Sequence, residues 1–364
     1  MLPRLGFTLG DPAGCGAELA IKLLSETDCL ERGWFRIFGD LELWRHTADC
    51  LHAVDTPRLE VVYSLEELAA AESVGATERH YFVAEPSLHP SSPVPPGGAS
   101  QEGGELVLRA LTVAVDAHKR GLIDGLLFMP VRHLERVFSV RVPRLHVPLG
   151  CMWSIRFSIS SSCVQLNKQS MHMGNIGHQD ELHWFAEALE YTGYICEINV
   201  LPPGEPSCPG GLWTTRVTSH IALHEVPQLV TSDRIKDATR LAYRELRAAG
   251  VSQPRIAVSG LNPHNGDGGI FGREEIDVIG PAVEELTAEL GASLAGTIAG
   301  PFPSDTIFLK AVAGEVDCVV TMYHDQGQVA MKLLGCERRL ALNHAPFRRV
   351  PAASTACIGH VRVD

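Results

Sequence analysis

The chain has 364 residues, an apolar content of 45% and a formal net charge of −12. Because this length exceeds one ordinary hydrophobic core, we expect two α/β domains in a globular protein. The acidic charge argues against a general nucleic-acid binder, since nonspecific affinity for phosphates depends on clustered Lys and Arg. No apolar stretch approaches the roughly 18 residues of a membrane span, so we expect a cytoplasmic enzyme without a membrane partner.

The ten cysteines contain no CxxC pair, and "MLPRLGFTLG" does not resemble a signal peptide. Disulfide frameworks are typical of small secreted chains with closely spaced cysteines. We therefore expect reduced thiols.

The first 130 residues alternate predicted strands and helices. "RLGFTLG" predicts a strand, followed by a helix with Asp11 as its N-cap and Pro12 at its first position. Gly14 and Gly16 permit either a dinucleotide-binding turn or close packing of helix on strand, because the GxGxxG pattern is not completed. Further strands are predicted in "WFRIFGD", "EVVYSL" and "RHYFVAE", then a long amphipathic helix and the strand "GLLFMP". This alternation indicates a mostly parallel sheet flanked by helices.

Residues 131–165 interrupt this pattern. They show neither a helical period nor strand alternation, and they contain five arginines and no lysine. Joining residue 130 directly to residue 166 would give the continuous segment "FMPLNKQSMHMG". We therefore predict an insertion at a single point, whose origin is either a retained intron or a genuine loop of this protein.

The regular pattern resumes after residue 166. Helices are predicted in "DELHWFAEALEYTG" and in "REEIDVIGPAVEELTAEL". Another is predicted in "SDRIKDATRLAYRELRAAG", with Ser232 or Asp233 as its N-cap and Gly250 past its end. Apolar runs predict strands in "ICEINVL", "LWTTRVTSHIAL", "RIAVSGL" and "VDCVVTMY". The last run is followed at once by polar residues, as is typical of a buried parallel strand that delivers its last residues to a sheet edge.

Three histidines share the same setting. His220, His264 and His324 each lie at or just beyond the carboxyl end of a predicted strand. If the strands lie in one sheet, their ends converge, and three neutral imidazoles can bind a divalent metal. The chain has 16 histidines, however, and these spacings match no local zinc motif. The pattern alone leaves both a metal site and a chance placement open.

Several motifs at these positions resemble those of the 4-hydroxythreonine-4-phosphate dehydrogenase (PdxA-like) family. They are "GDPAG", "GHQDE", "TSHIAL", "GLNPHNGDGGIFGREEIDVIGPAVEEL", "PFPSDT" and "MYHDQGQVAMKLLG". The resemblance implies a two-domain isocitrate/isopropylmalate dehydrogenase-like α/β fold with mostly parallel sheets. It also implies a homodimer whose subunits share the active site. The first domain is then expected at 1–130 with 333–364, and the second, which carries the metal site, at 166–332.

The resemblance also assigns roles to individual residues. The implied ligands of a divalent metal (zinc, magnesium or cobalt) are His220, His264 and His324. The implied substrate-binding residues are His178, Gln179, Asn167, Lys168, Lys332 and Arg349. The implied catalytic residues are Asp305, Asp325 and Lys332. For the two aspartates, the alternative is an N-cap or a hydrogen bond to a ligand histidine; for the lysine, it is a solvated surface position.

The implied activity is NAD-dependent oxidation, with decarboxylation, of a small hydroxy acid, phosphorylated or not. A metal on the substrate's hydroxyl oxygen lowers its pKa, a base takes the proton, and hydride passes to NAD. The chain departs from the family after Gly335: no "DHGTA" segment is present, and the family's asparagine position falls on Ala341 unless a gap in the alignment moves it to Asn343. An impaired relative that binds metal or ligand without turnover is therefore an alternative, and a metal hydrolase is a third, less favoured one.

Overall fold

The structure is a computed structural model. It describes residues 2–25, 30–31, 33–51, 59–73, 79–92, 94, 100–128, 181–201, 203–204, 207–293, 295–334, 340–343 and 359–361. The chain divides into two compact units. Unit 1 comprises Met1–Gly6, Val115–Leu127 and His178–His360, and unit 2 comprises Phe7–Ala114, Phe128–Gly177 and Val361–Asp364. The domain boundaries expected from the sequence stay a prediction.

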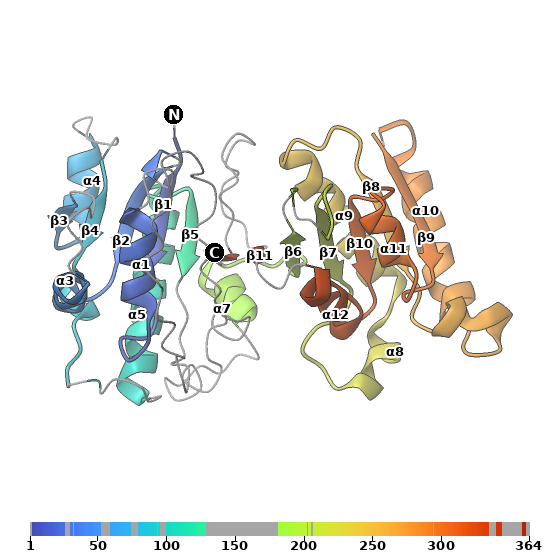
Figure 1. The fold of residues 1–364 in the computed structure, drawn as a ribbon, viewed down its shortest axis with the longest axis horizontal. Helices are drawn as coiled ribbons and strands as arrows, with labels where there is room; N and C mark the ends of the chain where they lie inside the picture. The colour runs from blue at the N-terminus through green and yellow to red at the C-terminus, as the bar shows by residue number, and fades with distance from the viewer. Residues whose placement is uncertain are drawn as a thin grey trace, which may run out of the picture. The chain divides into compact units, whose positions relative to one another are not determined.

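The amino-terminal part of the chain alternates strands and helices, as predicted (Figure 1). The strands are β1 (Arg4–Thr8), β2 (Trp34–Phe38), β3 (Glu60–Val62), β4 (Tyr81–Val83) and β5 (Gly125–Phe128). The helices are α1 (Gly16–Ser25), α3 (Leu41–Cys50), α4 (Leu65–Ser73), the short η1 (Pro86–Leu88) and α5 (Gln101–Lys119). Within unit 2, β4 pairs in parallel with both β2 and β3. The predicted parallel sheet is therefore confirmed here.

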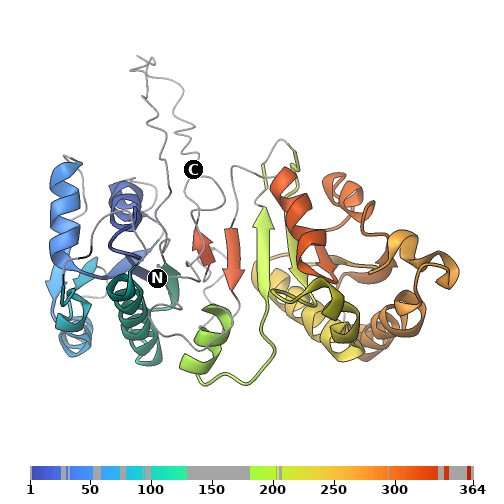
Figure 2. The ribbon, with the colours of Figure 1, turned by 90° about the horizontal axis from the view of Figure 1, so that it is seen from below.

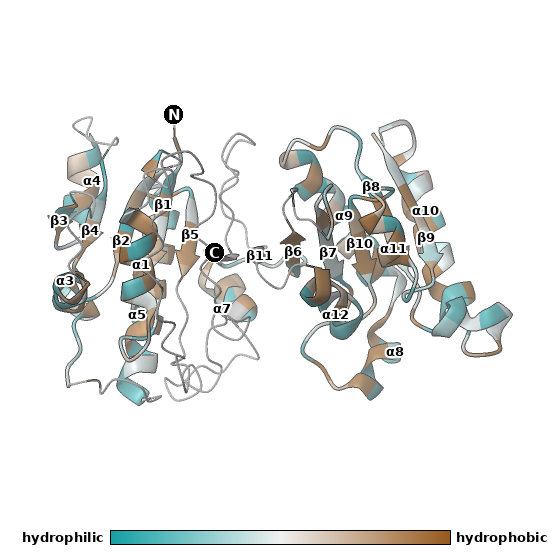
Figure 3. Cartoon of the chain, viewed as in Figure 1, coloured by the Kyte–Doolittle hydropathy of each residue, from teal (hydrophilic) through white to brown (hydrophobic). Residues whose placement is uncertain are grey.

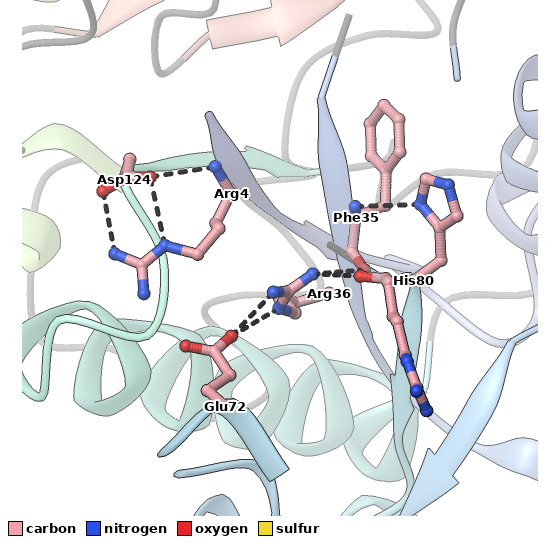
Figure 4. Close-up of polar contacts among 7 residues, drawn as sticks. Arg4, Phe35, Arg36, Glu72, His80 and Asp124 are labelled. Atoms are coloured by element: carbon pink, nitrogen blue, oxygen red, sulfur yellow. Dashed lines mark hydrogen bonds and ion pairs between the residues drawn. The ribbon is translucent and has the colours of Figure 1, made fainter. Parts of the chain in front are cut away.

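Side-chain hydrogen bonds and ion pairs join neighbouring segments of each unit (Figure 4). In unit 1, Arg4 pairs with Asp124, with Nη2 at 3.0 Å from Oδ1. In unit 2, the fully buried Arg36 of β2 pairs with Glu72 of α4, with Nη2 at 2.7 Å from Oε1. An arginine is rarely buried unless its charge is paired. This ion pair therefore accounts for the position of Arg36 inside the sheet.

The start of α1 differs from the prediction. The helix begins at Gly16, whereas the sequence predicted Pro12 as its first residue. The Asp11 carboxylate accepts a hydrogen bond from the Ala13 amide at 2.9 Å, and the Asp11 carbonyl accepts one from the Gly14 amide at 2.9 Å. Aspartate side chains form such local turns readily. Asp11 therefore closes a turn ahead of the helix instead of capping it.

Unit 1 contains the elements that position the candidate site. Its strands include β6 (Glu197–Leu201), β7 (Leu212–Arg216), β8 (Arg255–Ser259), β9 (Thr297–Phe302), β10 (Cys318–Thr321) and β11 (Leu340–Asn343). Its helices include α7 (Glu181–Ala188), α8 (Val226–Leu229), α9 (Ser232–Ala248), α10 (Gly280–Leu290), α11 (Ile307–Val312) and α12 (His324–Leu334). Its short 3₁₀-helical segments are η2 (Leu223–Glu225), η3 (Pro263–Gly269) and η5 (Gly291–Ser293), and η4 (Glu275–Ile279) is π-helical. The remaining short strand is β12 (Gly359–Val361), which the two units share.

The strand order in this part of the sheet is β11-β6-β7-β10-β8-β9. β7, β10, β8 and β9 run parallel, whereas β6 is antiparallel to both β7 and β11. The expected mixed α/β fold with mostly parallel strands is confirmed. The predicted N-cap of α9 is wrong by one or two residues: Thr231 occupies the position, and its hydroxyl accepts a hydrogen bond from the Arg234 amide at 3.4 Å.

Helices cover both faces of this sheet (Figures 1 and 2). Ile256, Val258 and Val320 pack with residues of α9 and α10. Ala257 and Val319 pack with residues of α11 and α12. Neighbouring residues of one strand point to opposite faces, so a strand covered on both sides must be apolar throughout. Figure 3 accordingly colours β5, β6 and β10 mainly brown.

Two expectations about the whole chain concern its cysteines and the membrane. The cysteines of the described residues are all free: Cys15, Cys50, Cys196, Cys208 and Cys318. Burial raises the pKa of the Cys196 thiol to about 12, which keeps it protonated and unreactive. None of the helices that the structure describes combines the length and apolarity needed to cross a bilayer.

Candidate active site

The three histidines predicted as metal ligands follow three adjacent parallel strands. β10 lies between β7 and β8, with Thr321 opposite Arg216 and Val320 opposite Val258. His220 lies four residues after β7, His324 three after β10 and His264 five after β8. The premise that these strands lie side by side in one sheet is confirmed. Ligands of open α/β sheets bind at this carboxyl edge.

His220 and His324 face each other across the ends of β7 and β10. Their ring centroids are 5.6 Å apart, with 43° between the ring planes. Thr218 joins the two strand ends, because both its backbone amide and its hydroxyl donate to the Met322 carbonyl, at 3.1 and 2.8 Å. These two hydrogen bonds to the same carbonyl hold the two histidine-bearing segments together.

The imidazole of His324 is oriented by the neighbouring carboxylate. Its Nδ1 lies 2.7 Å from Oδ1 of Asp325. A carboxylate partner favours a proton on Nδ1, which leaves the lone pair of Nε2 available to an electrophile. Burial lowers the pKa of His324, the charges of Arg216 and His220 act in the same direction, and the hydrogen bond with Asp325 opposes them. The neutral form, which is the form that binds metals, is therefore favoured near pH 7.

The segment after β8 has an unusual backbone. His264, Asn265 and Asp267 all have positive φ angles, of 53°, 57° and 45°. His220 after β7 has φ of 51°. A left-handed conformation costs about 1–2 kcal/mol for most residues other than glycine, whereas Asn and Asp adopt it more readily. Such strain persists only where surrounding contacts hold it, often at functional sites. Two of the three predicted ligands thus occupy strained positions.

Glu275 of η4 anchors the strained segment. Its Oε1 accepts hydrogen bonds from the amides of Leu261 and Asn262, at 2.7 and 2.6 Å. Its Oε2 accepts one from the Asn262 side chain at 2.9 Å. Asn265 donates to the Pro301 carbonyl at 2.8 Å, and its buried Oδ1 has no hydrogen-bond partner in the described part of the chain. A buried polar atom without a partner is uncommon in a folded protein.

The side chains fit a divalent metal only in part. The His220 and His324 imidazoles, one of them oriented by a carboxylate, are suitable donors for zinc or cobalt. Among the residues that the structure describes, however, no three His, Cys, Asp or Glu side chains are grouped closely enough to hold an ion. His264 does not complete a triad within one chain. Convergence of all three ligands, as expected for a shared dimer site, stays a prediction.

Arg216 is a site residue that the sequence reading missed. It is buried at the end of β7, where Nη2 donates to Glu197 Oε2 at 2.6 Å and Nε donates to the Ser219 hydroxyl at 2.9 Å. Ser219 directly precedes His220, so the guanidinium supports the turn that carries this histidine. Nothing in the local sequence distinguishes this arginine from a surface residue at a strand end.

Of the other predicted residues, Asp305 and Lys332 are exposed, and the rest fall outside the described residues. Asp305 is exposed and does not cap α11, whose N-cap position is occupied by Thr306. Lys332 is exposed in the last turn of α12. The predictions that fall outside the described residues are those for His178, Gln179, Asn167, Lys168, Arg349 and the segment 131–165.

The chain is similar to proteins of known name over most of its length. Residues 163–348 match the family model described as "Pyridoxal phosphate biosynthetic protein PdxA". A Pseudomonas aeruginosa protein provisionally named 4-hydroxythreonine-4-phosphate dehydrogenase 2 is 39% identical over 347 residues, covering 93% of this chain and 84% of the relative. The D-threonate 4-phosphate dehydrogenase of Bordetella bronchiseptica is 33% identical over 335 residues, covering 91% of this chain and 78% of the relative.

A solved structure is similar over nearly the whole chain. The 4-hydroxythreonine-4-phosphate dehydrogenase of Klebsiella pneumoniae superposes with a TM-score of 0.65 at 26% identity, over 95% of this chain and 89% of that one. The isocitrate/isopropylmalate dehydrogenase-like fold expected from the sequence is thereby confirmed. The family match spans more than half of this chain, and the sequence match to the Pseudomonas relative spans most of it. The chain belongs to the PdxA family.

Proposed function

We propose that the protein is a dehydrogenase that uses NAD and a divalent metal to oxidise a hydroxyl group of a small phosphorylated hydroxy acid. The dehydrogenase class rests on the named relatives at 39% and 33% identity. The observation that carries the metal dependence is the placement of His220, His324 and His264 after three adjacent parallel strands. A homodimer that completes the site is part of this proposal.

The chain's own residues would hold and orient the reacting groups. His220 and His324 would bind the metal, with Asp325 fixing the imidazole orientation of His324. When bound, the metal would supply Lewis acidity and the nicotinamide would accept a hydride. Asp305 is exposed and is a candidate base for the hydroxyl proton.

Lys332 is a candidate for contacting the substrate. It lies eight residues after His324 on α12, which places its Cα about 12 Å further along the helix axis. A phosphorylated acid of several carbon atoms could bridge part of that distance. The cationic side chain would then balance the negative charge of a carboxylate or phosphate.

Absorbance of NADH in the near ultraviolet tests the proposal. The purified chain is mixed with NAD, then with Zn²⁺, Mg²⁺ or Co²⁺, and with 4-hydroxythreonine 4-phosphate, D-threonate 4-phosphate or erythronate 4-phosphate. An aromatic cis-dihydrodiol serves as the unphosphorylated comparison. We expect NADH formation with a phosphorylated acid, and loss of that activity in the His324→Ala variant.

The same experiment separates the alternatives. Metal binding without NADH formation on any substrate would favour the impaired relative that binds without turnover. Release of inorganic phosphate or another hydrolysis product without NADH would favour the metal hydrolase. NADH formation that survives both metal chelation and the His324→Ala substitution would overturn the metal dependence while leaving the dehydrogenase class intact.

A further inference from the structure

Gln326 connects the two strand ends that carry His324 and His264. This residue is half-buried in the first turn of α12. Its side-chain oxygen Oε1 accepts hydrogen bonds from the amides of Met322 and Tyr323, at 2.8 and 3.4 Å. Its Nε2 donates to the Gly260 carbonyl at 3.0 Å. One amide group therefore engages three backbone groups from segments 66 residues apart.

The bonds to Met322 and Tyr323 have an ordinary explanation. A Gln or Glu at the third position of a helix commonly reaches back to the backbone amide at the N-cap. Gln326 occupies this position relative to His324, the first residue of α12. These two bonds stabilise the start of the helix, and either Gln or Glu could make them.

The bond to Gly260 goes beyond helix capping. The ladder between β10 and β8 ends at the pair Val320–Val258. Beyond that pair, the Gln326 side chain joins the chain segment entering His324 to the one entering His264. Gly260 directly precedes Leu261 and Asn262, whose amides Glu275 anchors. Gln326 thus connects α12 to the residues that directly precede the segment with positive φ angles.

We propose that Gln326 is a positioning residue that sets the separation of the His324 and His264 segments through its bond to the Gly260 carbonyl. The proposal rests on the proposed function in one respect, because it assigns these histidines to the metal. The coupling between the two segments is a property of the polypeptide and can be measured without any metal.

Glu at this position separates the two roles. Gln326→Glu keeps an oxygen that accepts from the Met322 and Tyr323 amides, but it places a carboxylate oxygen against the Gly260 carbonyl, where no donor remains. Gln326→Met removes all three hydrogen bonds at similar volume. Gln253→Glu is the matched control, since it makes the same charge change at an exposed residue near the opposite end of β8.

Hydrogen–deuterium exchange of the full chain measures the coupling. In Gln326→Glu we expect faster exchange in peptides covering residues 261–265, with peptides covering 322–323 still protected. In Gln326→Met both segments should exchange faster. Gln253→Glu should match the parent chain in both. Unchanged exchange over 261–265 in either Gln326 variant would overturn the proposal, whatever the metal does.

Co²⁺ binding, followed by its visible absorption spectrum, measures the consequence for the ligands. We expect Gln326→Glu to weaken Co²⁺ binding by about tenfold, the lower end of effects seen for groups that support metal ligands, and to alter the spectrum. Equal affinity and an identical spectrum in parent and variant would overturn the positioning role. A parent chain that binds no Co²⁺, with 261–265 still loosened in the variant, would refute the metal site but support the coupling.

Discussion

Replacing Glu72 with Gln tests the buried ion pair of unit 2. The side chains of Arg36 and Glu72 are 0% and 7% exposed. The guanidinium donates twice to Glu72 Oε1, at 2.9 and 2.7 Å, and once to the Arg79 carbonyl at 2.6 Å. Removing one charge of a buried pair costs about 3–5 kcal/mol, because the other charge stays buried without compensation. Gln keeps one acceptor oxygen, so we expect a loss near 3 kcal/mol.

The exposed pair of Glu60 and Arg79 provides the control. These side chains are 44% and 55% exposed, and pairs of this kind contribute about 0–1 kcal/mol. Urea unfolding of both Glu→Gln variants, followed by tryptophan fluorescence, compares the two sites, since Trp34 and Trp44 both lie in unit 2. A loss in the Glu72 variant no greater than that in the Glu60 variant would refute the reasoning.

A double substitution separates charge from packing. Arg36→Met with Glu72→Leu removes both charges and keeps an apolar filling of similar volume. Replacing a whole buried pair in this way is often neutral or stabilising. We therefore expect the double variant to be more stable than Glu72→Gln alone, and the reverse order would show that packing dominates.

Three further changes should have measurable effects. Asp325→Asn should weaken Zn²⁺ binding by about tenfold in calorimetry. This is the lower end of the range for groups that hydrogen-bond to a metal ligand, because the Asp325 side chain is 75% exposed. Equal Zn²⁺ affinity in the variant would contradict a role of Asp325 in orienting His324. Burial and the Arg36 charge lower the pKa of His80, whose ring accepts a hydrogen bond from the Phe35 amide. As the pH falls, the imidazole of His80 is therefore protonated in the unfolded chain before it is protonated in the folded chain. The contribution of neutral His80 to the free energy of unfolding should be complete above pH 6.5 and be lost as the pH falls through the folded-state pKa. The free energy of unfolding of the His80→Gln variant should therefore depend less on pH over this range. Deleting residues 131–165 should raise soluble yield or the unfolding midpoint if they are a retained intron, whereas their presence in the dominant transcript would show a genuine loop.

Local sequence patterns determined most of the elements and the setting of the histidines. Apolar runs such as "CVVT" and "IAVS" are short, rich in β-branched residues and followed by polar turns, which is sufficient to predict buried parallel strands. The position of His324 directly after such a run predicted its place at the carboxyl edge. The family resemblance gave the fold class, and the named relatives support it.

Only the tertiary structure decided which polar groups support the site. The strand order β7-β10-β8 differs from the order along the chain, and it places Gln326 beside Gly260. The antiparallel register of β6 and β7 places Arg216 beside Glu197. The left-handed backbone at His264 likewise has no local signal beyond its glycine-rich surroundings. Hydrogen bonds between distant segments depend on how the strands are ordered in the sheet, and periodicity within one segment carries no information about that order.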